Sequence, residues 1–238
     1  MFVFLVLVLM TAPVTAQQAS TQSTSATLVN QFKNEKVFWK QFAIAKEIVN
    51  LHDATVLSDL AGWLNHDDRH IRGNVAFIFA SLGDERGFPV ITEILDDRAD
   101  RPEGQGQTWA SSDGRYHVSQ QIRADRYYAA HLLGDLKDSR AVPILIGLLH
   151  DRDVRYVVPW ALAEIGDSRA NQPMIDLLHD DDPSFRVYVI QALVKLRAKG
   201  ALPRLRELQI DHEKSRLGNP ITVAEAATQA IAKLEAIP

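Results

Sequence analysis

Histidine and aspartate occur together in three short clusters, at residues 66–68, 150–151 and 179–182. Imidazole and carboxylate groups are common ligands of transition metals, so metal binding is the first chemistry to consider. Adjacent residues of one turn rarely converge on an ion, however, and clusters that recur along a chain are explained by the chemistry of polar turns. We therefore predict no metal site and no cofactor.

Catalytic sequence patterns are missing from the chain. It contains no His-Glu-x-x-His, no Gly-x-Ser-x-Gly and no glycine-rich phosphate-binding pattern. The 238 residues include no cysteine, which excludes disulfides, thiolate metal sites and cysteine nucleophiles. The net charge is -4 with acids and bases interspersed, whereas a nucleic-acid partner calls for a concentrated basic face. We predict no catalytic residue and no nucleic-acid partner.

Arginine pairs separated by 14 residues mark an internal repeat. They stand at 72 and 86, at 126 and 140, and at 155 and 169, and Pro143, Pro173 and Pro203 are spaced by 30 residues. Proline fits the first turn of a helix, where its missing N–H costs nothing. Each unit is expected to hold a short helix A, a polar turn and a helix B. The five predicted units span 54–86, 87–140, 141–169, 170–200 and 201–236.

The stretch from Leu136 to Arg155 carries the repeat most clearly, as Leu-x-Asp-Ser-Arg-Ala-Val-Pro-x-Leu-x-x-Leu-Leu-x-Asp-x-Asp-Val-Arg. It resembles the HEAT-like repeats first associated with phycobilin lyases, and the resemblance extends over residues 54–236. It implies an all-α fold, an α-solenoid in which antiparallel helix pairs stack into a superhelix. The segment 36–51 is apolar on one face and is expected to cover the first unit as an N-terminal capping helix.

The repeat also places charged residues at equivalent positions of several units. Equivalent side chains of stacked units lie above one another, so we predict a structural ladder of charge-assisted hydrogen bonds. Its arginines, at one position of helix B, are Arg72, Arg126, Arg155 and Arg186, and its aspartates, in the turns between units, are Asp84, Asp138 and Asp167.

Aromatic side chains and a histidine replace the charged residues expected on the outer face of helix B. In a superhelical stack the B helices line the concave surface, and aromatic residues in a groove anchor partners. The alternative is that these rings pack against each other or cover the core. The partner-binding candidates on this face are Tyr127 and Tyr156, at the third position of helix B, and Phe77, His131 and Trp160, at the seventh.

Two residues depart from the helix B pattern. Asp125 stands where the other units have an apolar first residue; either it pairs with Arg123 or Arg126, or its helix begins a turn earlier. Pro159 lies inside the predicted helix 154–165, where proline removes a hydrogen bond and kinks the helix. Such a kink would redirect the neighbouring Trp160.

An insertion loop at 98–119 interrupts the second unit between its two helices. Long loops on repeat arrays project from one edge and carry binding residues. The insertion contains Trp109 and Tyr116, which we add to the partner-binding candidates. Trp109 is expected either to dock over the aromatic face or to seal the loop to the body.

The N-terminus resembles a secretory signal peptide, residues 1–16. An apolar run at 2–10 leads to the small-residue site Val14-Thr15-Ala16, where cleavage is expected after Ala16. The run is shorter than the roughly 20 residues that span a bilayer, so no membrane span is expected in the mature chain. A Gln/Ser/Thr-rich tract follows, and we predict a flexible segment over 17–30 and a HEAT-like repeat domain over 31–238.

These inferences predict a monomeric, non-catalytic binding scaffold, periplasmic or secreted, that holds a protein or peptide partner on its concave face. The first alternative is an enzyme or enzyme subunit of the bilin-lyase type, which the family resemblance suggests. The second alternative is a structural component of the cell envelope.

Overall fold

The computed structural model describes residues 16–99, 118–216 and 220–237, without the side chains of 16–22 and 118–121. The signal-peptide run ahead of Ala16 lies outside the described residues. So do most of the insertion loop and both of its candidates, Trp109 and Tyr116.

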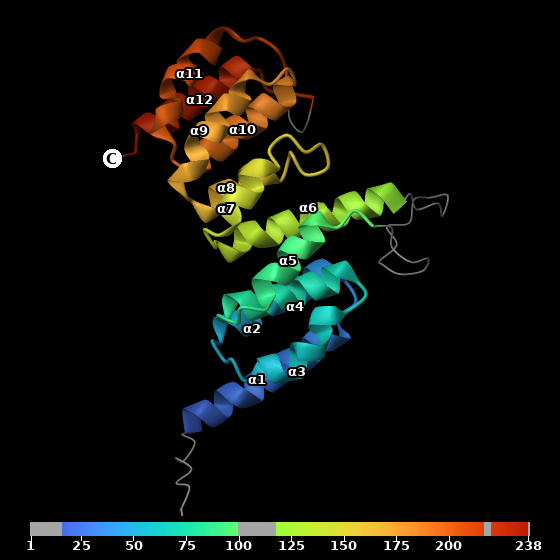
Figure 1. Cartoon of the computed structure of the whole chain (residues 1–238). Coiled ribbons are helices and arrows are strands. Elements are labelled where there is room, and N and C mark those ends of the chain that lie inside the picture. The colour runs from blue at the N-terminus through green and yellow to red at the C-terminus, as the bar shows by residue number, and fades with distance from the viewer. Residues whose placement is uncertain (1–15, 100–117, 217–219, 238) are drawn as a thin grey trace, which may run out of the picture.

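Five pairs of antiparallel helices, preceded by two N-terminal helices, follow one another along the described chain (Figure 1). The N-terminal helices are α1 (Ala16–Asn34) and α2 (Phe38–Asn50). The A helices, with the 3-10 turns that extend them, are α3 (Val56–Leu60) with η1 (Ala61–Asn65), α5 (Gly87–Asp96), α7 (Ala141–Gly147), α9 (Asn171–Asp176) between η2 (Ser168–Ala170) and η3 (Leu177–His179), and α11 (Leu202–Glu207) between η4 (Lys199–Ala201) and η5 (Leu208–Ile210). The B helices are α4 (Arg69–Ser81), α6 (Val118–Leu136), α8 (Val158–Ile165), α10 (Pro183–Lys195) and α12 (Val223–Glu235).

The helices form two layers that share one hydrophobic core. Helix α2 packs on α4, α4 on α6, α6 on α8, α8 on α10 and α10 on α12, so the B helices form a continuous row capped by α2. Each A helix packs against its own B helix on the other side of the core. The chain climbs from α1 at one end of the stack to the C-terminus at the other (Figure 1). This arrangement is the predicted all-α solenoid.

Local sequence signals set the helix boundaries. Asp68 and Asp182 accept backbone N–H groups at the starts of α4 and α10, and Thr222 forms a capping box with Glu225 at the start of α12. The three equally spaced prolines occupy the first turns of their A helices, as the repeat predicts. Gly166 ends α8 with φ 77°, a left-handed conformation that glycine adopts without strain.

Close packing of α4 against α5 requires a glycine. A Cβ atom at Gly87 would lie 2.3 Å from both the carbonyl oxygen of Ala76 and the backbone nitrogen of Ala80. The two helix backbones are therefore nearly in contact where the first unit meets the second.

Helix α1 corrects the predicted flexible segment at 17–30. It runs from Ala16 to Asn34 and contacts α2 and α3, with Val29 and Phe32 fully buried. The polar composition of the tract obscured these two apolar residues, which lie three apart on one helical face. The predicted capping helix at 36–51 is present as α2, which buries Phe42 and Ala45.

Two helices begin elsewhere than predicted. Helix α6 starts at Val118, seven residues before Asp125, so the open choice about that residue is decided for an earlier start. Helix α8 starts at Val158, and the predicted kink at Pro159 is wrong, because this proline occupies the first turn of the helix. Residues 152–157 form turns instead, since a helix running through them would bring the proline ring against a backbone carbonyl.

Candidate binding face

Arginines at the equivalent positions of the units join consecutive units through the polar turns between helices A and B. Arg126 and Arg186 lie on B helices, whereas Arg155 lies in the turn just before α8. The Arg126 guanidinium donates to Asp151, 2.6 Å away, and to Asp153 in the next unit, 2.7 Å away. Arg155 donates to Asp180 and Arg186 to Asp211, each 25 residues further along the chain, at 2.9 and 2.8 Å. These bonds form a ladder along one edge of the stack.

The ladder's acids are not the predicted ones. Asp84, Asp138 and Asp167 each pair with the arginine two residues later in their own turn, Arg86, Arg140 and Arg169. Hydrogen bonds from these arginines lower the pKa of Asp84 and Asp167 to about 2. The structure therefore contains two sets of Arg–Asp pairs in place of the predicted one. In the first set both residues lie in the same turn between two units, and in the second set the arginine and the aspartate belong to consecutive units. Each aspartate of the first set pairs with the arginine two residues later because that side chain is closer than the arginine of helix B.

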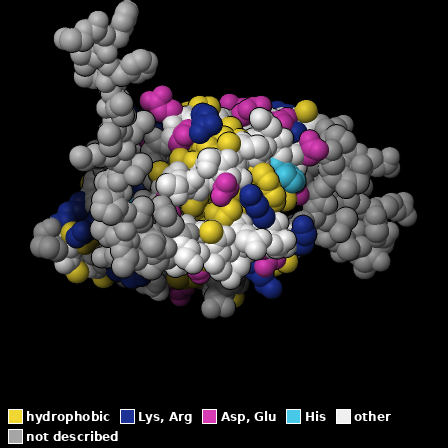
Figure 2. Space-filling view, turned by 90° about the horizontal axis from the view of Figure 1, so that it is seen from below, with side chains coloured by type: hydrophobic (Ala, Val, Ile, Leu, Met, Phe, Trp, Pro, Cys, Tyr) yellow, Lys and Arg dark blue, Asp and Glu magenta, His cyan; other side chains and the backbone are white. Residues whose placement is uncertain are grey.

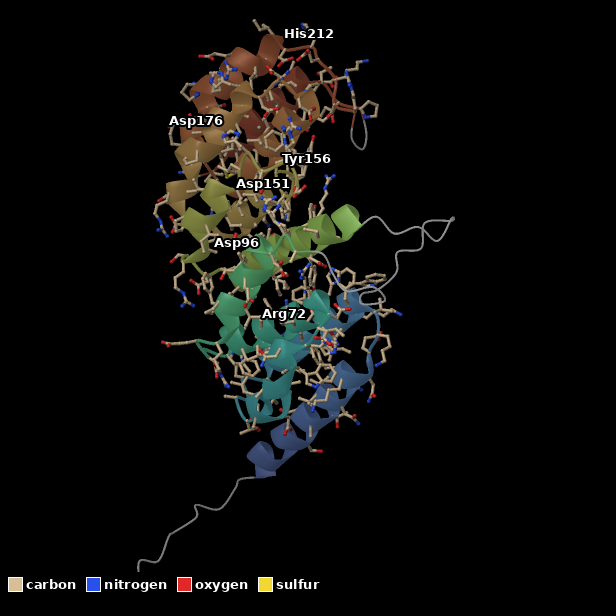
Figure 3. The ribbon with its side chains drawn as sticks, turned by 45° about the vertical axis from the view of Figure 1, so that its right-hand side comes forward. Arg72, Asp96, Asp151, Tyr156, Asp176 and His212 are labelled. Atoms are coloured by element: carbon tan, nitrogen blue, oxygen red, sulfur yellow. The ribbon has the colours of Figure 1, made fainter. Side chains whose placement is uncertain are left out.

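The acids of the cross-unit set also shape their own turns. Asp151, Asp180 and Asp211 each accept the backbone N–H two residues later, as in an Asx turn. Figure 3 shows Asp151 close to Tyr156 in the turn of unit three, with His212 of the unit-five turn further up the stack. The recurring His-Asp clusters thus serve turn geometry and inter-unit pairing.

The first junction departs from this scheme. Arg72 donates to the carbonyl of His66 at 2.7 Å, in its own unit. Arg69, one turn earlier on α4, instead pairs with Asp97, which stands 25 residues after Arg72. Arg69 also donates to the fully buried Asp125, 3.2 Å away. The predicted ladder role of Arg72 is therefore taken by Arg69.

Asp125 pairs with residues of α4. Besides Arg69, its carboxylate faces the imidazole Nε2 of His70 at 3.5 Å. Of the two arginines expected as its partners, Arg126 donates to Asp151 in the next unit and Arg123 is exposed. A buried carboxylate at this position is tolerated because a charged donor from the neighbouring unit compensates it.

Phe77 belongs to the core and not to the binding face. It is 4% exposed and meets Phe42 of α2 edge-on at 4.9 Å between ring centroids. The capping helix α2 covers this end of the B-helix row, so the alternative of core packing holds for this candidate.

Tyr127 and His131 line a hollow between α2, α4 and α6. Tyr127 is 41% exposed, and His131 is exposed beside it. The hollow measures about 390 Å³, and its other walls are Phe38, His70, Arg123, Ala124 and Tyr128. Phe38 stacks on His70 at 4.2 Å and meets Tyr128 edge-on at 4.9 Å. We call this feature the aromatic hollow.

Trp160 and Tyr156 lie further along the same row of helices. Trp160 is 37% exposed and borders a second, smaller groove of about 290 Å³ between α8, α10 and α12. Tyr156 donates to Asp182 at 2.6 Å, so its hydroxyl is tied to the next unit. Burial raises the pKa of Tyr156 to about 12, and this hydrogen bond adds to the effect. Tyr156 therefore serves the inter-unit contact as well as the face.

Tyr188 packs against Tyr156 and Trp160 and was missed from the sequence. Its ring lies 5.9 Å from that of Tyr156 and 6.4 Å from that of Trp160. Burial raises its pKa to about 12, with a further contribution from the nearby Tyr127. Tyr128 and Tyr188 share the fourth position of helix B, next to the third position that was inspected, so an aromatic signal at that position could have found them.

The outer surface carries both signs of charge. The view from the N-terminal end shows acidic, basic and apolar side chains intermixed on that face (Figure 2). Within the described ranges, no group of three or more histidines and carboxylates is arranged to hold a metal ion. No helix among the described residues is long and apolar enough to cross a membrane.

Residues 120–186 and 150–232 match the family model for HEAT repeats. The region from 120 to 232 is therefore built of HEAT repeats. The matched region runs from α6 to α12, and the structure extends the same helix pairing to α3 and α4, ahead of the match. No curated protein matches the chain. The bilin-lyase type of repeat stays a prediction.

Proposed function

We propose that this chain is an extracytoplasmic, non-catalytic HEAT-like scaffold that binds a protein partner on the face of its B helices. The observation that carries the proposal is the exposure of Tyr127 and Trp160 on that face, where solenoids of this type expose charged residues. Large aromatic side chains that remain accessible are the usual anchors of protein interfaces. HEAT repeats commonly mediate protein interactions, which agrees with this role.

The proposed location rests on the N-terminal sequence. Cleavage after Ala16 would remove the apolar run and leave α1, which begins at that residue, almost whole. The mature chain would then start at Gln17 and keep the contacts that Val29 and Phe32 make with the first unit. A monomer is proposed because α1 and α2 pack on the first unit and the last helix, α12, exposes the polar residues Glu225, Gln229 and Lys233.

A double variant, Tyr127→Ala with Trp160→Ala, tests the binding role. The full chain is immobilised, exposed to the envelope fraction of its own cells, and bound proteins are quantified by mass spectrometry. We expect the variant to keep its helical circular dichroism and to lose a partner that the wild type retains. The matched control is Ile210→Ala, which shortens a side chain that is 81% exposed on η5.

Three outcomes would contradict the proposal. Unfolding of the double variant would show that the two rings are structural. Retention of every partner would show that they do not bind. Recovery of the chain only from the cytoplasm, with no form beginning at Gln17, would reject the proposed location.

A further inference from the structure

The aromatic hollow has walls that suit a ring and a rim that suits an anion. Phe38, Tyr127 and Tyr128 present aromatic surface from two helices, and the hollow's volume lies near the lower end of the range for ligand sites. A space of this size admits one large side chain rather than a folded domain. Aromatic rings there would receive a further ring edge-on or in an offset stack.

Basic groups border this hollow. Arg123 is exposed at its rim, one helical turn before Tyr127 on α6. Burial raises the pKa of the Tyr127 hydroxyl, and the nearby guanidinium partly offsets that effect. His131 forms another part of the wall, and the Phe42 ring lies against it. The Lys46 ammonium of α2 lies 4.7 Å from the centroid of that Phe42 ring.

The acids around the hollow already have cationic neighbours. Asp135 lies 3.7 Å from Lys46 and 3.9 Å from His131, and Asp125 is buried against Arg69. Arg123, by contrast, is exposed at the rim of the hollow. A guanidinium can hold a carboxylate through two parallel hydrogen bonds.

We propose that the aromatic hollow binds an acidic peptide segment of the partner protein, with an aromatic side chain inserted between Phe38 and Tyr127 and a neighbouring carboxylate on Arg123. This inference rests on the proposed function and names the chemistry of the segment that the face recognises. The aromatic ring provides the buried contact, and the carboxylate provides the charge preference.

Fluorescence anisotropy with four labelled nine-residue peptides tests the inference on the full chain. The first peptide has a central Trp flanked by two Asp on each side in a Gly/Ser background. The second has Lys in place of Asp, the third has Ala in place of Trp, and the fourth has both replacements. We expect the first to bind at least about tenfold more tightly than the other three, and to weaken as salt is added.

Arg123→Glu provides the decisive variant. We expect it to weaken the Asp-flanked peptide by at least about tenfold and to reverse the preference toward the Lys-flanked peptide. The matched control is Arg152→Glu, which makes the same charge change at an exposed residue of the unit-three turn and should leave both affinities unchanged. Circular dichroism of each variant confirms that the fold is kept.

Equal affinity for the Asp-flanked and Lys-flanked peptides would overturn the inference, as would an Arg123→Glu variant with unchanged preference. A failure of this inference can be distinguished from a failure of the proposed function. If the Tyr127→Ala, Trp160→Ala variant loses its partner while the peptides show no charge preference, only the inference about acidic segments falls. If that variant retains every partner, the proposed function falls whatever the peptides do.

Discussion

The junction between units one and two differs from the three junctions that follow it. At the later junctions, an arginine on helix B or in the turn just before it reaches an aspartate 25 residues further along, in the next A–B turn. At the first junction the aspartate is in the expected place, as Asp97, but Arg69 reaches it in place of Arg72. Asp125 and His70 then join the contact below the surface.

The comparison shows which part of the repeat the fold requires. The turn aspartate is fixed because it shapes its own turn as well as accepting the arginine, whereas the arginine can come from either of two neighbouring helical turns. Moving the arginine to Arg69 brings its guanidinium next to the first residue of helix B in the following unit. That position is apolar in the other units, and here it is a carboxylate.

Arg126 should be the most costly ladder residue to remove. It is 1% exposed and binds Asp151, Asp153 and the carbonyl of Leu95. Arg126→Ala removes the donor to the Leu95 carbonyl and leaves the two aspartates with the exposed Arg98, which lies 2.6 Å from Asp151 and 3.5 Å from Asp153. We therefore expect a loss of about 3 kcal/mol in the free energy of unfolding. Arg155→Ala, at a half-buried rung, should cost only about 1 kcal/mol. Urea unfolding followed by circular dichroism measures both, and equal losses would show that burial does not rank the rungs.

Asp125 should depend on Arg69 for its place in the core. Asp125→Ala removes one partner of a guanidinium that keeps Asp97, so we expect a loss of about 2–3 kcal/mol. Asp125→Val combined with Arg69→Met restores an apolar contact and should be close to neutral. A double-mutant cycle of Asp125→Val, Arg69→Met and the combined variant, measured by urea unfolding, gives the coupling. If the double variant loses the sum of the two single losses, the first junction is not a coupled unit.

The pH dependence of unfolding should report the regular junctions. The hydrogen bond from Arg126 lowers the pKa of Asp151 from its ordinary value of 3.8 to about 2 in the folded chain. The stabilisation from this pair is therefore complete above pH 4 and disappears as the pH falls toward about 2. Asp151→Asn should flatten the acid limb of a plot of unfolding midpoint against pH. Asp181→Asn, at an exposed acid, should leave that limb unchanged; an identical flattening in both variants would disprove the assignment.

The sequence predicted the helix pairs well because their signals are local. Prolines in first turns, capping aspartates and the 14-residue spacing each depend on a few neighbouring residues, and the spacing persisted across the insertion. The predicted flexible segment at 17–30 and the kink at Pro159 were wrong for a related reason. Whether the tract at 17–30 is ordered depends on what packs against it, and its polar composition does not reveal this. Where α8 begins also depends on its packing, which a single proline does not reveal.

The candidate face could be predicted only in part. Tyr127, His131 and Trp160 were found from their helical positions and are exposed, while Phe77, at the same position in its unit, is buried because α2 lies over it. Tyr188 and Arg123 belong to the candidate face only because of residues that other helices bring next to them. Tyr188 packs against rings of the preceding unit, and Arg123 borders a hollow that α2 and α4 also line. No spacing within one repeat specifies such contacts.

The sequence alone determined the repeat, the helix boundaries near prolines and caps, and the residue types available to each turn. These features follow from hydrogen bonds and steric limits within a few residues. The tertiary structure decided which aspartate each arginine meets, which aromatic rings remain exposed, and that Asp125 is compensated by Arg69. Stacking sets these choices, because side chains from different units compete for the same partners only after the helices have packed.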